Sequence, residues 1–140
     1  MASLNDEMST HAAVPEISNL LGFEVTQCLV DRALSLRFSR GQQSALLRIE
    51  RSFRLTLDSE WELDPASDRA SLGPSLRLFG RVVESAQLLV TGELELVLSG
   101  GAGLLLYRGR NCEAWTLRLP DDILVVSGID GEISVFRNQL

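Results

Sequence analysis

Two passages of this sequence resemble each other, and their pattern constrains the fold more than any other feature. Each has a glycine, an apolar residue three positions later, a small residue three positions after that, and then an alternating apolar strand that ends near a glycine. The matching residues are Gly22, Val25, Cys28 and Leu34-Ser35-Leu36-Arg37-Phe38 in the first passage, and Gly80, Val83, Ala86 and Leu94-Glu95-Leu96-Val97-Leu98 in the second. Apolar residues at every second position are typical of half-buried β-strands. The pattern therefore predicts a β-rich fold with pseudo-repeats over residues 20–57 and 78–107.

The rest of the chain continues this pattern of short strands and turns. Strands are predicted over residues 24–30, 33–38, 44–50, 53–57, 82–90, 93–99, 104–107, 114–119, 123–126 and 132–136, and residues 60–63 are expected to continue the fourth strand after a kink. Leu72, Leu76 and Phe79 stand at helical spacing, which predicts one short helix over residues 72–79. We therefore predict a mainly β fold that borders on the α+β class, built from about ten short antiparallel strands. Either a rolled sheet or a two-sheet sandwich would bury the apolar stripes, and the sequence leaves both open.

The length of 140 residues predicts a single domain. Residues 1–15 are polar and aperiodic, so a disordered tail is expected there, followed by one β-rich domain over residues 16–140. The chain has no apolar run of the roughly 18 residues that a membrane span needs. Residues 1–15 also lack the basic and apolar regions of a secretory signal. We expect a cytoplasmic protein that does not enter a membrane.

The sequence offers few residues for catalysis. All thirteen basic residues are arginine, and the single histidine, His11, falls in the predicted tail. Triads that need a histidine base are therefore excluded. Cys28 and Cys112 have no cysteine or histidine near them, so a zinc site, which needs about four ligands, is excluded as well. We predict a protein that is not an enzyme, with no catalytic residues, no metal site and no cofactor.

Acidic side chains recur at every second position between Asp58 and Asp64, within a chain of net charge −6. In an extended segment these carboxylates would share one face and could meet a basic partner. A divalent metal site and a solvated strand edge are the alternatives. Trp61 and Trp115 are flanked by acids and are candidate interface anchors. The predicted partner-binding residues are Asp58, Glu60, Trp61, Glu62, Asp64 and Trp115.

Residues 32–54 hold six arginines and one acid, the opposite balance. Arg37, Arg48 and Arg54 alternate with apolar residues on predicted strands, so they would point outward and could form an anion-binding face. No aromatic residues interleave with them for base stacking, and the overall charge is negative. The arginines therefore form an alternative anion-binding set, while the composition argues against nucleic acid as the partner.

Several short motifs together resemble a family of small bacterial domains of unknown function, seen mostly in actinobacteria. They are Leu21-Gly22-x-x-Val25, Leu34-x-Leu36-x-Phe38, Ser71-Leu72-Gly73-Pro74 running into Leu78-x-Gly80-x-x-Val83, and Glu113-Ala114-Trp115-x-Leu117. The likeness spans residues 17–136, although Cys112 stands where the family pattern has an aromatic residue. The resemblance implies a single compact β-rich domain and brings no catalytic residues. Small acidic proteins of this kind, immunity proteins among them, often accompany secreted bacterial toxins.

These observations favour a non-enzymatic protein-binding domain. The specific form that we consider is an immunity-type protein that masks a basic toxin domain. A β module that binds a ligand or a nucleic acid through the arginine face is the first alternative. A self-assembling structural homodimer is the second, because Leu46 and Val97 are apolar residues on otherwise polar strand faces.

Overall fold

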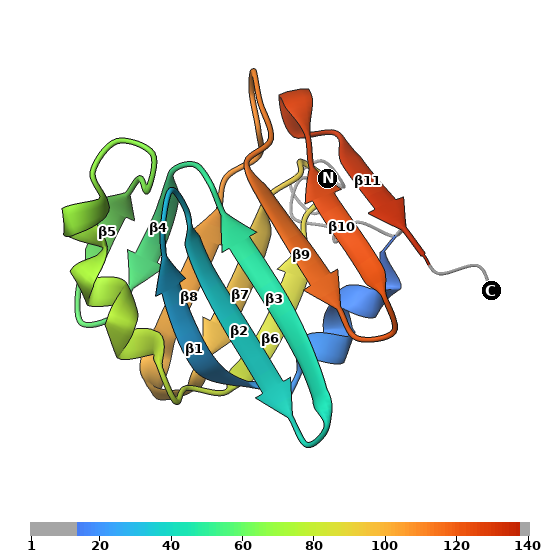
Figure 1. Ribbon diagram of the computed structural model, residues 1–140, viewed down its shortest axis with the longest axis horizontal. Helices are drawn as coiled ribbons and strands as arrows, with labels where there is room; N and C mark the ends of the chain where they lie inside the picture. The colour runs from blue at the N-terminus through green and yellow to red at the C-terminus, as the bar shows by residue number, and fades with distance from the viewer. Residues whose placement is uncertain (1–13, 138–140) are drawn as a thin grey trace, which may run out of the picture.

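The structure, a computed structural model, describes residues 14–137 and consists of two antiparallel sheets (Figure 1). The six-stranded sheet has the order β1-β2-β3-β9-β10-β11, and the five-stranded sheet has the order β5-β4-β8-β7-β6. The strands are β1 (Glu24–Val30), β2 (Leu34–Arg40), β3 (Gln43–Ile49), β4 (Phe53–Thr56), β5 (Glu60–Leu63), β6 (Val83–Leu88), β7 (Leu94–Leu98), β8 (Ala102–Leu106), β9 (Trp115–Leu119), β10 (Ile123–Ser127) and β11 (Ile133–Phe136). The 3-10 helices are η1 (Pro15–Leu20), η2 (Arg69–Leu78), η3 (Ser99–Gly101) and η4 (Ile129–Gly131). The predicted mainly β fold is confirmed.

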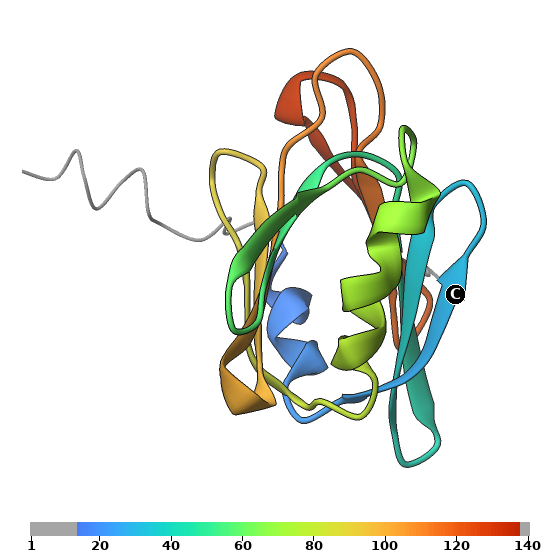
Figure 2. The same ribbon diagram turned by 90° about the vertical axis from the view of Figure 1, so that its left-hand side faces the viewer.

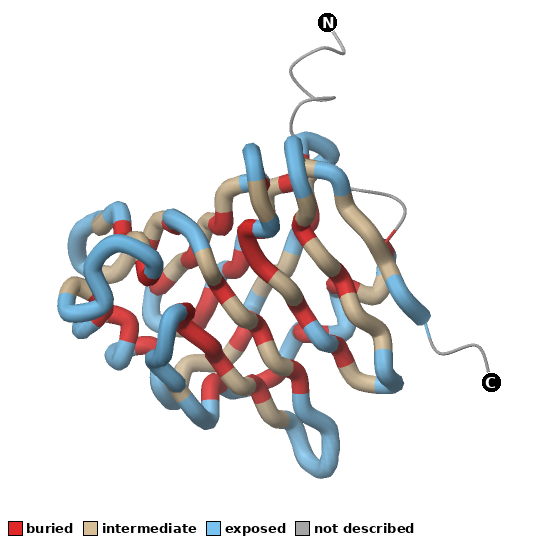
Figure 3. The backbone as a smooth tube through the Cα atoms, turned by 45° about the horizontal axis from the view of Figure 1, so that its top comes forward, coloured by how far each residue is buried: buried red, intermediate tan, exposed pale blue. Residues whose placement is uncertain are grey.

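The two sheets face each other, and η1 and η2 lie in the space between them (Figure 2). The strands β3, β7, β8 and β9 bury alternate residues. Figure 3 shows buried residues alternating with more exposed ones along the middle strands of the six-stranded sheet. Leu34, Leu36 and Phe38 of β2 have no exposed surface, and they face a similar buried stripe on β7 that includes Leu96. The apolar stripes of the two glycine passages thus form the core of a sandwich, one of the two predicted arrangements.

The two glycine passages meet each other at one corner, where they connect the sheets. Gly22 N–H donates to the carbonyl oxygen of Val83 at 2.9 Å, and Gly80 N–H donates to that of Val25 at 2.8 Å. Gly22 and Gly80 have φ angles of 85° and 86°, which residues with a side chain rarely adopt. Glycine therefore allows the chain to turn from η1 into β1 and from η2 into β6 with the same geometry.

The predicted helix is present as η2, but it buries a different face. A 3-10 helix has three residues per turn, so residues three apart share a side. Leu72, Ser75 and Leu78 are buried, whereas Leu76 and Phe79 are 55% and 62% exposed. The spacing of Leu72, Leu76 and Phe79 fits an α-helix, but in this 3-10 helix it does not mark the buried side. None of the helices within residues 14–137 has the length and hydropathy to span a membrane.

Two smaller predictions also change. Residues 60–63 do not continue β4 but form β5, which turns back and pairs antiparallel with β4. The predicted tail extends too far, because Val14 is 2% exposed in the core and Pro15 begins η1. The remainder of that tail, residues 1–13 with His11, lies outside the described residues.

Candidate anion-binding site

The predicted acidic segment lies on β5, at the edge of the five-stranded sheet, and in the turns beside it. Asp58 accepts a hydrogen bond from Arg77 at 3.2 Å, and the Asp64 carboxylate accepts the Ala66 N–H at 2.9 Å within a turn. Glu60 is exposed, and its carboxylate makes no hydrogen bond or ion pair within residues 14–137, although its charge acts on the Arg54 guanidinium. Most of these acids are therefore hydrogen-bonded inside the molecule, and Glu60 is the one whose carboxylate is not.

Glu62 lies at the centre of a polar group on the outer face of the five-stranded sheet. Its carboxylate accepts the Arg54 Nε–H at 2.8 Å and the Tyr107 hydroxyl at 2.8 Å. The hydrogen bond from Arg54 lowers the pKa of Glu62 below its ordinary value. Burial raises the pKa of Tyr107, and the Glu62 carboxylate raises it further. The three side chains thus satisfy one another across β4, β5 and the end of β8.

Because Tyr107 is the only tyrosine of the chain, its ionisation can be measured directly. We expect the ultraviolet absorbance of tyrosinate to titrate with a midpoint above 10.0, the ordinary value. The pKa is raised in the folded state, so this contribution to stability is present below pH 10.0 and is lost as the pH rises through the folded pKa. Glu62→Gln should move the midpoint down, while Glu60→Gln leaves it in place. A midpoint at or below that of the unfolded chain would contradict the arrangement.

The two tryptophans do not form an exposed pair of anchors. Trp61 is half-buried on β5 and packs against the core, and Trp115 on β9 is 1% exposed. The prediction that Trp115 contacts a partner is wrong on this point, because its side chain fills the interior between the sheets. Its indole N–H has no hydrogen-bond partner within the described residues.

The predicted homodimer surface is also divided. Leu46 lies on β3 of the six-stranded sheet, and Val97 lies on β7 of the five-stranded sheet. The outer faces of two stacked sheets point in opposite directions, so one contact surface cannot contain both residues.

The predicted arginine face is divided in the same way. Arg37 and Arg48 lie on neighbouring strands of the six-stranded sheet, whereas Arg54 belongs to the other sheet. Arg37 donates to Gln27 at 3.1 Å, and Arg48 pairs with Asp31 at 3.3 Å. The structure therefore does not bring the three predicted arginines together, and each is held by a neighbouring side chain.

A different set of arginines gathers around a hollow of about 410 Å³, which we call the loop pocket. It is lined by Arg51, Ser52, Tyr107, Arg108, Gly109, Arg110, Asn111 and Cys112, so it lies between the β3–β4 connection and the β8–β9 loop. None of its lining residues is Asp or Glu. Arg108 and Arg110 are exposed, and their side chains bond to no residue within 14–137. The pocket therefore presents three positive charges and several hydrogen-bond donors.

Gly109 holds the loop of this pocket against the β10–β11 turn. A Cβ atom at this position would overlap the carbonyl oxygen of Gly128 and would lie 2.5 Å from that of Cys112. Asp130 N–H also donates to the carbonyl oxygen of Arg110 at 2.8 Å. The close approach of two backbones requires glycine here, and it determines where the flanking arginines lie.

A second hollow of about 650 Å³, the turn pocket, lies beside the first. It is lined by Arg32, Arg48, Glu50, Arg51, Pro65, Ala66, Ser67, Asp68, Arg69 and Ala70, from the β1–β2 turn, the end of β3 and the start of η2. Arg69 donates only to the backbone oxygen of Asp31, at 3.5 Å, and the side chain of Arg32 bonds to nothing in the described part of the chain. Glu50 pairs with Arg48 at 3.6 Å. Two of the four guanidinium groups are thus open to an incoming anion.

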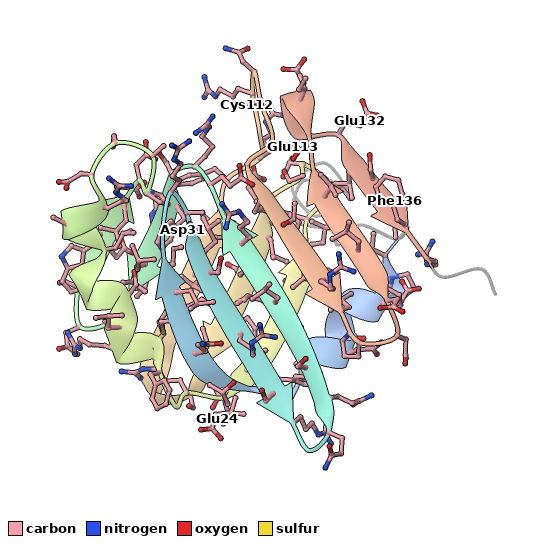
Figure 4. The ribbon with its side chains drawn as sticks, viewed as in Figure 1. Glu24, Asp31, Cys112, Glu113, Glu132 and Phe136 are labelled. Carbon is pink, nitrogen blue, oxygen red and sulfur yellow. The ribbon has the colours of Figure 1, made fainter. Side chains whose placement is uncertain are left out.

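Arg51 belongs to both pockets, and two contacts hold its guanidinium group. Its Nε–H donates to the Cys112 sulfur at 2.9 Å, and its Nη1 donates to the Glu50 carbonyl oxygen at 3.3 Å. The hydrogen bond to Cys112 raises the pKa of Arg51, which is cationic at any physiological pH. Cys112 and Asp31 lie toward the same end of the sandwich (Figure 4), so both pockets belong to one arginine-rich end.

The arrangement can bind and orient anions. Guanidinium groups bind phosphate and carboxylate oxygens through paired N–H donors. Within residues 14–137 no three His, Cys, Asp or Glu side chains are grouped as a metal site requires. The excess of arginine over residues 32–54 pointed to Arg32, Arg48 and Arg51. Sequence reasoning missed Arg69, Arg108 and Arg110, which reach the same end of the molecule only through folding.

Comparison with known proteins supplies a family and no function. No curated protein and no solved structure matched the chain. The model of a family of unknown function (DUF6188) matches residues 17–137, which is nearly the whole chain. The predicted resemblance to a family of unknown function is confirmed at this level, and the chain belongs to the DUF6188 family.

Proposed function

We propose that the protein is a non-enzymatic binding domain that holds an anionic ligand at its arginine-rich end. The observation that supports this most strongly is the loop pocket, where Arg51, Arg108 and Arg110 surround a hollow that no Asp or Glu lines. A hollow lined by charges of one sign concentrates the field and attracts the opposite charge. The net charge is −6, so much of the remaining surface repels anions, and the arginine-rich end is the place where an anion is favoured.

The chemistry of the lining residues suits binding. Arginine keeps its charge at any physiological pH, so the guanidinium groups can donate hydrogen bonds to an anion without exchanging protons near neutral pH. Arg51 is already oriented by Cys112 and Glu50, which reduces the entropy lost when a ligand binds. We propose phosphate groups as the best ligand, because they accept several guanidinium N–H bonds at once.

Isothermal titration with inorganic phosphate tests this proposal. The double variant Arg108→Gln and Arg110→Gln should bind at least about tenfold more weakly, because it loses two charge-assisted hydrogen bonds. Arg118→Gln, which removes one charge outside the loop pocket, is the control: Arg118 is exposed on β9 and lines a hollow that also contains Asp121 and Asp122. The control should bind like the native protein. Absence of binding to the native protein, or an equal loss in the control, would contradict the proposal.

Binding of a protein partner at β5 is the second candidate function. In its specific form, this chain would be an immunity-type protein that masks a basic toxin domain. This candidate is favoured by the position of Glu60, an exposed acid whose carboxylate makes no hydrogen bond within residues 14–137, on a strand at the edge of its sheet. An open edge can accept a strand from another protein, and carboxylates speed the approach of a basic one. In both candidates we place the protein in the cytoplasm of a bacterium. A partner that is captured at low salt, released at high salt and lost in Glu60→Arg would support this candidate, and no capture at low salt would count against it.

A further inference from the structure

The turn pocket and the loop pocket are adjacent hollows that share one arginine. Arg51 appears in the lining of both, while Arg32, Arg48 and Arg69 line only the first, and Arg108 and Arg110 line only the second. The two contacts that hold Arg51 use Nε and Nη1, so the Nη2 group keeps both of its N–H donors. A guanidinium group held in this way can donate to an anion in either pocket.

We propose that the ligand is a chain of phosphate groups that occupies both pockets at once, with Arg51 between two of them. This inference rests on the proposed anion-binding function and goes further. It specifies an oligophosphate that fills both pockets, whereas a single phosphate would fill only one. The second phosphate of such a chain binds as part of the same molecule, so its effective concentration is high and it adds affinity without a second association step.

The charges on the two sides of Arg51 support a ligand with two anionic groups. The loop pocket adds Arg108 and Arg110, with no carboxylate among its lining residues. The turn pocket adds Arg32 and Arg69, the two guanidinium groups there that no side chain of residues 14–137 pairs. A single phosphate in the turn pocket, which Glu50 and Asp68 also line, would leave Arg108 and Arg110 without a counter-ion among the residues that line the loop pocket.

The lining residues favour phosphate chains over nucleic acid. Proteins that bind single-stranded nucleic acid combine a basic groove with aromatic side chains on which the bases stack. The one aromatic residue in the two linings is Tyr107, and its hydroxyl is held by the Glu62 carboxylate on the outer face of the five-stranded sheet. The pockets therefore offer many contacts to phosphate oxygens and little to a base.

Isothermal titration with orthophosphate, pyrophosphate and tripolyphosphate, at matched ionic strength and without divalent cations, tests the inference. For the native protein we expect the dissociation constant to fall at least about tenfold from orthophosphate to tripolyphosphate. Arg69→Gln should remove most of this gain while orthophosphate binding stays near the native value, because orthophosphate prefers the loop pocket. Arg118→Gln, which carries the same loss of charge outside both pockets, should keep the full gain.

The possible outcomes separate the inference from the function on which it rests. Binding of orthophosphate with no gain along the series, or an equal gain in Arg69→Gln, would overturn the two-pocket inference and leave the anion-binding function standing. No binding of any of the three anions to the native protein would overturn both. Tighter binding of a single-stranded oligonucleotide or of a glutamate-rich peptide, at equal charge, would overturn phosphate chains as the ligand.

Discussion

Replacing Trp115 with alanine is expected to lower the free energy of unfolding by about 3–5 kcal/mol, the usual range for a large buried aromatic residue. Trp115 is 1% exposed and is among the largest fully buried side chains of the molecule. Its backbone lies between Ile49 of β3 and Ser127 of β10 in the six-stranded sheet, and its side chain is buried in the core between the two sheets. Denaturation in urea, followed by circular dichroism, measures the loss.

Two further variants show whether burial is the cause. Trp115→Phe should cost less than Trp115→Ala, because it keeps a ring in the core and removes an indole N–H that has no partner in the described chain. Val126→Ala is the control on the neighbouring strand β10, where Val126 lies between the buried Val125 and Ser127 and is less buried than either. A loss in Trp115→Ala no larger than that in Val126→Ala would contradict the core position of Trp115.

Replacing Gly109 with alanine is expected to abolish the loop pocket. The new Cβ atom would meet the backbone oxygens of Gly128 and Cys112, neither of which can move without displacing its own turn. Overpacking of this kind costs about 1–3 kcal/mol, and the loop can relieve it only by lifting Arg108 and Arg110 away from Arg51. Phosphate affinity should therefore fall by at least about tenfold, the same loss that is expected when the two arginines are replaced.

Gly73→Ala is the matched control for this substitution. Gly73 lies in η2, its φ angle is not in the positive range, and a Cβ atom there would have no heavy atom within 4 Å. Native phosphate binding and native stability are expected for Gly73→Ala. If Gly109→Ala binds phosphate as well as Gly73→Ala does, the loop does not hold the arginines in place, and the pocket is not the binding site.

The period of two along the strands predicted most of the fold, because each sheet has one face in the core. The stripe of Leu34, Leu36 and Phe38 is buried as expected. The sequence could not distinguish a rolled sheet from a sandwich, since both bury the same residues. The helix type in η2 was also not predictable. The spacing of Leu72 and Leu76 fits an α-helix, whereas the three-residue turn of the 3-10 helix buries Leu72 and Ser75.

The candidate site was harder to predict, because its residues come from distant segments. Alternation along a strand says which side chains point outward, and it grouped Arg37, Arg48 and Arg54 on that basis. Which strands become neighbours is decided by the topology, and Arg54 joined the other sheet. Arg110 comes to line the same pocket as Arg51 through a loop whose course depends on backbone contacts at Gly109, and no local pattern predicts such contacts.

The most direct test of the anion-binding account is a nuclear magnetic resonance titration of the arginine side-chain Nε–H signals with tripolyphosphate. All thirteen Lys and Arg positions are arginine, so the signals sample every side chain that carries a fixed positive charge at neutral pH. We expect the largest shifts for Arg51, Arg108 and Arg110, smaller shifts for Arg32 and Arg69, and no shift for Arg118. Shifts of equal size over all arginines, or shifts that are largest at Arg118, would contradict this account.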